Sequence, residues 1–451
     1  MVIKMFKLKL AISKNFLISL LFIVLIFGIF CINVDGIYAS DNNQTDDGFK
    51  LDKNTQDKLK NSQINNLKEN THDDILKANG GTFQTIRDKI KSTPDGGTLV
   101  LDGIYTASNS DDVIVVNKPI TITSNSPTIL NGMGISQIFK FKSKAVGSTI
   151  SNLKFINGYA VKGGAILIEG KDISVFNCIF EENKVSYVGG AVASSYNTTT
   201  PSNALIQDCQ FIKNSATISA GALALFGDNS KVINCIFDSN YATNDFGNDS
   251  YGGAIQIGMD GSQSRCQVID STFINNWAFS NSLFHSHGGA GCVRNGVEYT
   301  GCKFINNSAG EGGALTFHAS GVIDNCIFIN NTARDYGGAL STGFLYTGAM
   351  KLRILNSDFD GNSAPYGGAI QLAGENIYVE NSKFNKNFAS INGGAVNIAA
   401  TTVELFNNNF NNNWANVDGG AVYIKGRNTK IHQSSFISNV QFLMLISMMM
   451  V

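Results

Sequence analysis

The chain has 451 residues, of which 15% are charged, with 46 glycines, 5 prolines and a formal net charge of −1. A charge so close to zero excludes nucleic-acid binding through a broad basic surface, because phosphate contacts require clustered Lys and Arg. The length alone would suit more than one domain, but a regular internal repeat predicts one repetitive body instead.

The N-terminal residues 1–39 are predicted to be an export signal. Four lysines precede an apolar run over 16–32, and Ala39 offers a small residue for cleavage. The run is long for a signal peptide and marginal for a membrane span, so an uncleaved signal anchor is the alternative. Residues 40–76 are polar and Asn-rich, which predicts a flexible spacer.

A short helix is predicted next, because Phe83, Ile86 and Ile90 recur at helical spacing and Thr82 could serve as its N-cap. Such a helix would cover the first coil of a solenoid, whose strand edges and apolar stacks are otherwise exposed. Irregular first coils are expected over residues 98–132.

One short phrase then recurs to the end of the chain. Its phenylalanines return at intervals of 24 to 36 residues: Phe155, Phe180, Phe211, Phe237, Phe273, Phe304, Phe328, Phe359, Phe384, Phe410 and Phe436. All but the first are followed three residues later by asparagine: Asn183, Asn214, Asn240, Asn276, Asn307, Asn331, Asn362, Asn387, Asn413 and Asn439. A Gly-Gly-Ala step and a branched aliphatic residue come between successive phenylalanines. This period predicts a solenoid, propeller or array.

Each coil reads as three short strands separated by bends. The residue two before Phe is small, so it and the Phe point to one face of a strand. Asn marks one bend because it tolerates left-handed backbone, and Gly-Gly marks another, where a Cβ is excluded. The coils lack helical spacing and are shorter than the propeller blades of about 40 residues.

The fold is therefore predicted to be all-β, a single right-handed parallel β-helix over residues 77–440 with a short N-terminal capping helix. Stacked coils would create a Phe stack, an aliphatic stack and an Asn ladder. Residues 441–451 are an anomalous hydrophobic tail. We interpret this tail as a truncated or frame-shifted end, with a tail folded over the last coil as the alternative.

The cysteines are predicted to be structural thiols. Five occupy the position two before Phe, where other coils have Ser: Cys178, Cys209, Cys235, Cys302 and Cys326. Their exchange with Ser indicates a small inward residue rather than a disulfide framework or a zinc site. Cys266 and Cys292 fall outside this column.

Two histidines, His285 and His287, stand in the longest insertion, with Arg294 and Glu298 following. A His-x-His pair could hold a metal or serve acid–base chemistry. No further ligand aligns with it, and the insertion reads as a polar surface loop. We therefore predict no catalytic, metal-binding or cofactor-binding residue.

Polysaccharide lyases and glycoside hydrolases also use β-helices, and they form the alternative class. They need carboxylates gathered with each other or with a basic residue on one face of several coils. Here Asp208 and Asp270 replace a bend Asn. The remaining acids scatter over different columns: Asp238, Asp358, Asp360 and Glu404. We therefore expect no enzymatic activity.

The phrases Phe-x-x-Asn and Gly-Gly-Ala-(Ile/Val/Leu) resemble the repeats of the chlamydial polymorphic outer-membrane proteins. With its lysine-rich signal, Asn-rich coils and segment 101–105, the chain looks most like the adhesin-like surface proteins of methanogenic archaea that carry related repeats. The resemblance implies an exported β-helix that attaches to cells or surfaces without catalysis.

We therefore expect a secreted or cell-surface adhesin-like protein. Its partners would be glycans or proteins on other cells, with membrane contact only through the N-terminal segment if that is uncleaved. A purely structural envelope element is a further alternative. The segments that differ most between coils are the expected contact sites: 194–203, 244–251, 259–265, 280–287 and 342–350.

Overall fold

A computed structural model describes most of the predicted repeat region. The described residues are 80–195, 203–244, 249–258, 264–281, 286–294, 296–343 and 351–441. The predicted export signal, the spacer and nearly all of the anomalous tail lie outside them, as do most residues of the five expected contact segments.

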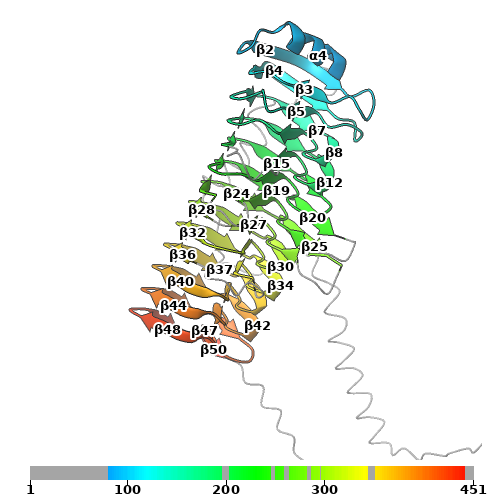
Figure 1. The fold of residues 1–451 in the computed structure, drawn as a ribbon. Helices are drawn as coiled ribbons and strands as arrows, with labels where there is room; N and C mark the ends of the chain where they lie inside the picture. The colour runs from blue at the N-terminus through cyan, green and yellow to red at the C-terminus, as the bar shows by residue number, and fades with distance from the viewer. Residues whose placement is uncertain are drawn as a thin grey trace, which may run out of the picture. The chain divides into compact units, whose positions relative to one another are not determined.

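The described chain is a parallel β-helix, as predicted, built from three long sheets that run along the stacked coils (Figure 1). The first sheet has 25 strands, the second 13 and the third 12. A coil contributes two short strands to the first sheet and one to each other sheet. One such coil contains β14 (Leu205–Gln207), β15 (Gln210–Ile212), β16 (Ser215–Ala216) and β17 (Leu223–Leu225).

Helix α4 (Phe83–Ser92) covers the first coil. Phe83, Ile86 and Ile90 are buried, and the helix packs against β1 (Gly80–Thr82), β2 (Thr98–Thr106) and β3 (Ile114–Val116). Thr82 stands at the N-cap, as predicted, although its side chain makes no capping hydrogen bond. Among the described residues, no helix is long and apolar enough to cross a membrane.

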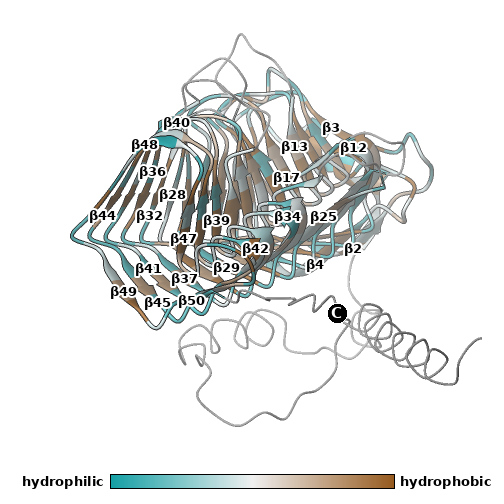
Figure 2. Ribbon diagram, turned by 90° about the horizontal axis from the view of Figure 1, so that it is seen from below, coloured by the Kyte–Doolittle hydropathy of each residue, from teal (hydrophilic) through white to brown (hydrophobic). Residues whose placement is uncertain are grey.

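The core is a set of side-chain stacks. From Phe155 to Phe436, neighbouring phenylalanine rings lie parallel, with centroids 4.6–5.0 Å apart. Figure 2 shows hydrophobic residues recurring in register along the stacked strands. Each fully buried ring contributes about 1.5–3 kcal/mol, and only the next coil completes the burial.

The predicted Asn ladder runs beside the Phe stack. From Asn183 to Asn413, each side-chain amide donates to the amide oxygen of the next Asn at 2.9–3.0 Å. The ladder residue itself is not the left-handed one. The residue just before it takes that conformation, as at Glu182 (φ 55°), and a second left-handed residue, Asn177 (φ 46°), lies three before Phe180.

One coil departs from the pattern through a compensated pair of residues. Gly291 stands where other coils have a branched aliphatic residue, and Tyr299 replaces an aliphatic residue in the column five before Phe. Tyr299 is fully buried. A Cβ on Gly291 would lie 3.0 Å from Ile255 and Leu315 and 3.2 Å from the Tyr299 hydroxyl. The missing side chain of Gly291 makes room for the larger Tyr299.

This pair predicts a stability coupling. Gly291→Val alone should cost about 1–3 kcal/mol by overpacking. Tyr299→Val alone should cost about 2–4 kcal/mol through the cavity it leaves. The double variant restores the residue types of the other coils and should lie within about 1 kcal/mol of the parent. Urea unfolding of the parent, the two single variants and the double variant measures the four free energies of unfolding. A loss in the double variant equal to the sum of the two single losses would contradict the predicted coupling.

Candidate functional site

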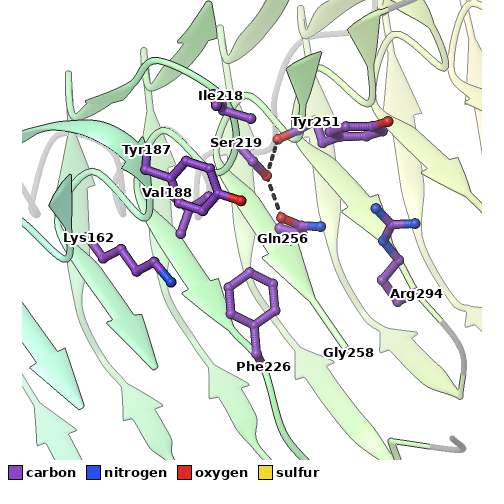
Figure 3. Close-up of a pocket in the computed structure, with 10 residues that line it drawn as sticks. All are labelled: Lys162, Tyr187, Val188, Ile218, Ser219, Phe226, Tyr251, Gln256, Gly258 and Arg294. Carbon is purple, nitrogen blue, oxygen red and sulfur yellow. Dashed lines mark hydrogen bonds between the residues drawn. The ribbon is translucent and has the colours of Figure 1, made fainter. Parts of the chain in front are cut away.

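A hollow of about 350 Å³ opens on the outside of the solenoid, where the second sheet turns into the third. Ten residues line it and are drawn in Figure 3: Lys162, Tyr187, Val188, Ile218, Ser219, Phe226, Tyr251, Gln256, Gly258 and Arg294. Its volume lies in the range of small-molecule sites, about 300–1,000 Å³.

The hollow arises from a column that the repeat leaves variable, the residue just before Gly-Gly. Backbone pairing places successive members of this column on neighbouring coils. From the hollow onward they are Lys162, Val188, Ser219 (which precedes Ala-Gly), Tyr251, His287 and Glu311, and the column continues through Tyr336, Tyr366, Asn392 and Asp418. The inward positions of these coils serve the core, so this outward column is where coils can differ in chemistry.

A second column follows the third-sheet strands and faces the first across the hollow. It supplies Phe226, Gly258 and Arg294 to the lining. Between the two columns the outward third-sheet residues of two coils are Ala193 and Ala224, which pack with Val188 and Phe226 in a small apolar cluster. These methyl side chains are short, which leaves room above them.

Both cations of the lining rest against aromatic rings. The Lys162 ammonium lies 5.3 Å from the centre of the Tyr187 ring, and the Arg294 guanidinium lies 5.3 Å from that of Tyr251. Between them, Ser219 donates to the backbone carbonyl of Tyr251 at 2.8 Å and is hydrogen-bonded to Gln256 (Figure 3). The lining thus combines rings, positive charge and hydrogen-bonding groups.

A buried polar cluster adjoins the hollow beside Tyr251 and Arg294. We define it as Asp249, Tyr251, His287, Arg294, Glu311 and His318. His287 is 6% exposed and Glu311 is 1% exposed. The His287 Nδ1 atom lies 3.6 Å from a Glu311 carboxylate oxygen, and its Nε2 atom lies 3.9 Å from Asp249.

Ring stacking and hydrogen bonds hold this cluster together. The Tyr251 ring stacks on the His287 ring with centroids 5.1 Å apart, and the Tyr251 hydroxyl donates to Asp249 at 2.8 Å. Arg294 Nη1 lies 3.1 Å from Nδ1 of His318. Because a guanidinium only donates hydrogen bonds, this His318 nitrogen is the acceptor.

Burial controls protonation in the polar cluster. Burial raises the pKa of Tyr251, and its hydrogen bond to Asp249 adds to the effect, so the phenol keeps its proton. Burial, then electrostatic interaction with the neighbouring His287 and Arg294, holds the pKa of His318 well below its usual value of 6.5. His318 is therefore neutral when it accepts from Arg294.

The depressed His318 pKa predicts acid sensitivity. Below about pH 6.5 the unfolded chain binds a proton at His318 that the folded protein does not, so stability should fall as the pH falls, by up to about 1.4 kcal/mol per pH unit. Urea midpoints at pH 7.5 and 5.0 measure this loss. His318→Gln should flatten the dependence, whereas His432→Gln, at a half-exposed site, should keep it; equal slopes in both variants would contradict the prediction.

The structure changes the expectation for the histidine insertion. His285 lies outside the described residues. His287 is buried in strand β26 (Ser286–His287), so the expectation of a surface loop was wrong for this residue. Arg294 joins it in the polar cluster, whereas Glu298 lies apart on the exposed face of the first sheet, where it accepts from Gln267 at 3.2 Å.

The prediction that the acidic residues scatter over different columns did not include Asp249 and Glu311, which both lie beside His287. Sequence reasoning missed Tyr251, Glu311 and His318. The signal that could have found them is the residue before Gly-Gly, read as one column across all coils. Within the described residues, no group of three or more His, Cys, Asp or Glu side chains is placed to hold a metal ion.

Six of the cysteines pack in the main hydrophobic core, whereas Cys292 pairs in register with Gln256 of the hollow lining. All seven cysteines within the described residues are buried, and none of them forms a disulfide bond. Those in the column before Phe donate to the carbonyl two residues earlier at 3.2–3.5 Å. Burial raises the pKa of Cys209, Cys235 and Cys302 well above the usual value, so these thiols stay protonated.

Comparisons with known proteins agree with the repeat. Residues 325–343 match the Chlamydia polymorphic membrane protein repeat. The chain is 34% identical to the protein described as Probable autotransporter YfaL of Escherichia coli (strain K12), over 25% of this chain and 10% of that protein. This chain therefore matches only about a tenth of the relative's length.

Two solved structures resemble the chain at a distance. A PL6 alginate lyase in complex with a trisaccharide has a TM-score of 0.46 and 13% identity over 78% of this chain and 85% of that one. The catalytic domain of a GH87 α-1,3-glucanase in complex with nigerose has a TM-score of 0.40 and 14% identity over 80% and 66%. Neither likeness bears on what this chain binds. The chain carries repeats of the polymorphic membrane protein type, wound into a parallel β-helix.

Proposed function

We propose that this protein is an exported, adhesin-like β-helix of the cell surface that binds glycans through the hollow without catalysing a reaction. The predicted export signal and the repeats of the polymorphic membrane protein type support the surface location. The resemblance to archaeal adhesin-like proteins points the same way and stays a prediction.

The observation that carries the proposal is the lining of the hollow. Tyr187, Phe226 and Tyr251 present three aromatic rings, with Ser219 and Gln256 between them. A sugar ring has apolar C–H faces and hydroxyl groups around its edge. Aromatic surfaces with a few placed polar groups match both features, because rings cover the faces and polar groups bond the hydroxyls.

The carboxylates near the hollow are placed for structure. Among the described residues that line it, none is Asp or Glu. Glu311 is almost fully buried, and the Asp249 carboxylate accepts a hydrogen bond from the Tyr251 hydroxyl. A glycosidase needs two carboxyl groups flanking the scissile bond. A lyase needs a deprotonated base to take a proton from the sugar, and the raised pKa of Tyr251 keeps its phenol protonated.

A polysaccharide lyase or glycoside hydrolase remains the second candidate. The polar cluster favours it, because Asp249, His287 and Glu311 gather beside a hollow that could hold a sugar. Acids, a histidine and an arginine within one site are groups that such enzymes use.

The two candidates separate in one experiment. The full-length protein is tested for binding on a glycan array, while reducing ends and unsaturated sugar are assayed with the bound glycans. Saturable binding without turnover is expected. Turnover would replace the adhesin proposal with the enzyme, and absence of any glycan binding would contradict both.

A matched pair of variants places the binding in the hollow. Tyr187 and Tyr378 are each 43% exposed, but only Tyr187 lines the hollow. Tyr187→Ala should weaken glycan binding at least tenfold, and Tyr378→Ala should leave it unchanged. Equal loss in the two variants would place the binding elsewhere.

A further inference from the structure

The charged residues of the hollow point to a narrower class of glycan ligands. We infer that it binds an anionic oligosaccharide laid along the axis of the solenoid, with Lys162 and Arg294 holding anionic groups on different sugar units. This inference rests on the glycan binding proposed above and specifies which glycans bind.

Positive charge dominates the lining. Lys162 and Arg294 are the charged members of the ten lining residues, and both are cationic. Among the described residues, Lys162 forms no ion pair with a carboxylate; its ammonium rests on the Tyr187 ring. In a half-enclosed site with aromatic walls, such a charge attracts an anionic partner more strongly than in open solvent.

Arg294 is held in place before any ligand arrives. Its guanidinium lies over the Tyr251 ring, which in turn stacks on His287, and it contacts neutral His318 at 3.1 Å. A guanidinium has five N–H donors, so it can bond His318 and an anionic group together. Carboxylates and sulfates match its planar donor pairs, and a preorganised donor loses less entropy on binding.

The spacing of the two cations requires an extended ligand. Lys162 pairs with Val188, Val188 with Ser219, Ser219 with Tyr251, and Tyr251 with His287 in the coil of Arg294. Four steps at the strand spacing amount to about 19 Å between the coils of the two cations. One sugar does not reach both, whereas an oligosaccharide running across the coils does. Tyr187, Phe226 and Tyr251 lie between them.

Calorimetry with the full-length protein tests the inference. The probes are a uronic-acid tetrasaccharide, its carboxyl-reduced neutral counterpart, the single uronic acid, a sulfated tetrasaccharide and, as an anion without sugar, a poly-glutamate peptide. We expect a charged tetrasaccharide to bind at least tenfold more tightly than the neutral one and the monosaccharide, and its affinity to fall with added salt. The uronic and sulfated probes show which anionic group is preferred.

Variants identify the cations. Lys162→Gln and Arg294→Gln should each weaken binding of the preferred tetrasaccharide about tenfold, and the double variant should show about the product, since the sites are too far apart to couple. Lys231→Gln removes an exposed charge from the outer face of the first sheet and should change nothing. If Arg294→Gln destabilises the folded protein, the affinity of the Lys162→Gln variant alone tests whether the cations bind the ligand.

Other results overturn the inference in distinguishable ways. Equal binding of neutral and charged tetrasaccharides removes the anionic specificity and leaves the proposed function standing. Equal binding of the single uronic acid removes the extended ligand. Binding of a poly-glutamate peptide but of no sugar overturns the inference and the proposed function together.

Discussion

Gly368→Ala should destabilise the β-helix by more than about 4 kcal/mol, a loss large enough to abolish folding in many domains. Gly368 is the second glycine of its Gly-Gly step. A Cβ built there would lie 2.1 Å from the carbonyl oxygen of Gly394 and 2.5 Å from that of Phe388. These are backbone atoms of the next coil, so relief requires the coils to separate and lose their ladder hydrogen bonds.

Gly134→Ala is the matched control. Gly134 has a left-handed backbone (φ 72°), which Gly368 lacks, but a Cβ there meets no atom within 4 Å. Only the backbone strain of about 1–2 kcal/mol then applies. Urea unfolding followed by far-UV circular dichroism compares the two variants with the parent. If both variants lose a similar free energy of unfolding, the clash with the next coil is not the reason that the second position of the step requires glycine.

Asn331→Ala should cost about 3–5 kcal/mol by interrupting the Asn ladder. The Asn331 side chain accepts from the backbone and side-chain amides of Asn307, each at 3.0 Å. It donates to Asn362 and to the Phe304 carbonyl, again at 3.0 Å. Removing it leaves several buried groups without a partner, at about 1–3 kcal/mol each, partly offset by relaxation.

The neighbouring residue provides the control for the ladder. Asn330 is exposed and left-handed (φ 52°), so Asn330→Gly keeps a residue that tolerates this conformation and should change stability by less than about 1 kcal/mol. The same unfolding assay applies. A small effect of Asn331→Ala would mean that water or a rearranged neighbour replaces the lost amide.

The fold could be predicted from the repeat because inward residues face nearly the same surroundings in every coil. Phenylalanine and Asn therefore recur at fixed places, and ten aligned copies outweigh any local ambiguity. Thr82 shows the limit at the end of the repeat. There the sequence contains an N-cap residue, but whether its side chain bonds the helix depends on the rotamer that packing selects.

The candidate site could not be predicted in the same way, because its residues do not repeat. Tyr251, His287 and Glu311 have different chemistry and are separated by tens of residues in sequence. Only the coil register shows that they stack directly on each other. Insertions of unequal length hide that register, and Arg294 reaches the same place from a different strand.

The variable column before Gly-Gly has an evolutionary consequence. One coil can nearly replace another, because the inward side chains of every coil fit those of its neighbours. The residue before Gly-Gly faces outward, so packing of the core does not restrict its chemistry. Unequal recombination that removes one whole coil would shift the cations and rings on either side by one strand spacing, about 4.8 Å, and leave the packing intact. New arrangements of binding groups can then arise by changes in copy number, faster than point mutations could build them and without a loss of foldability.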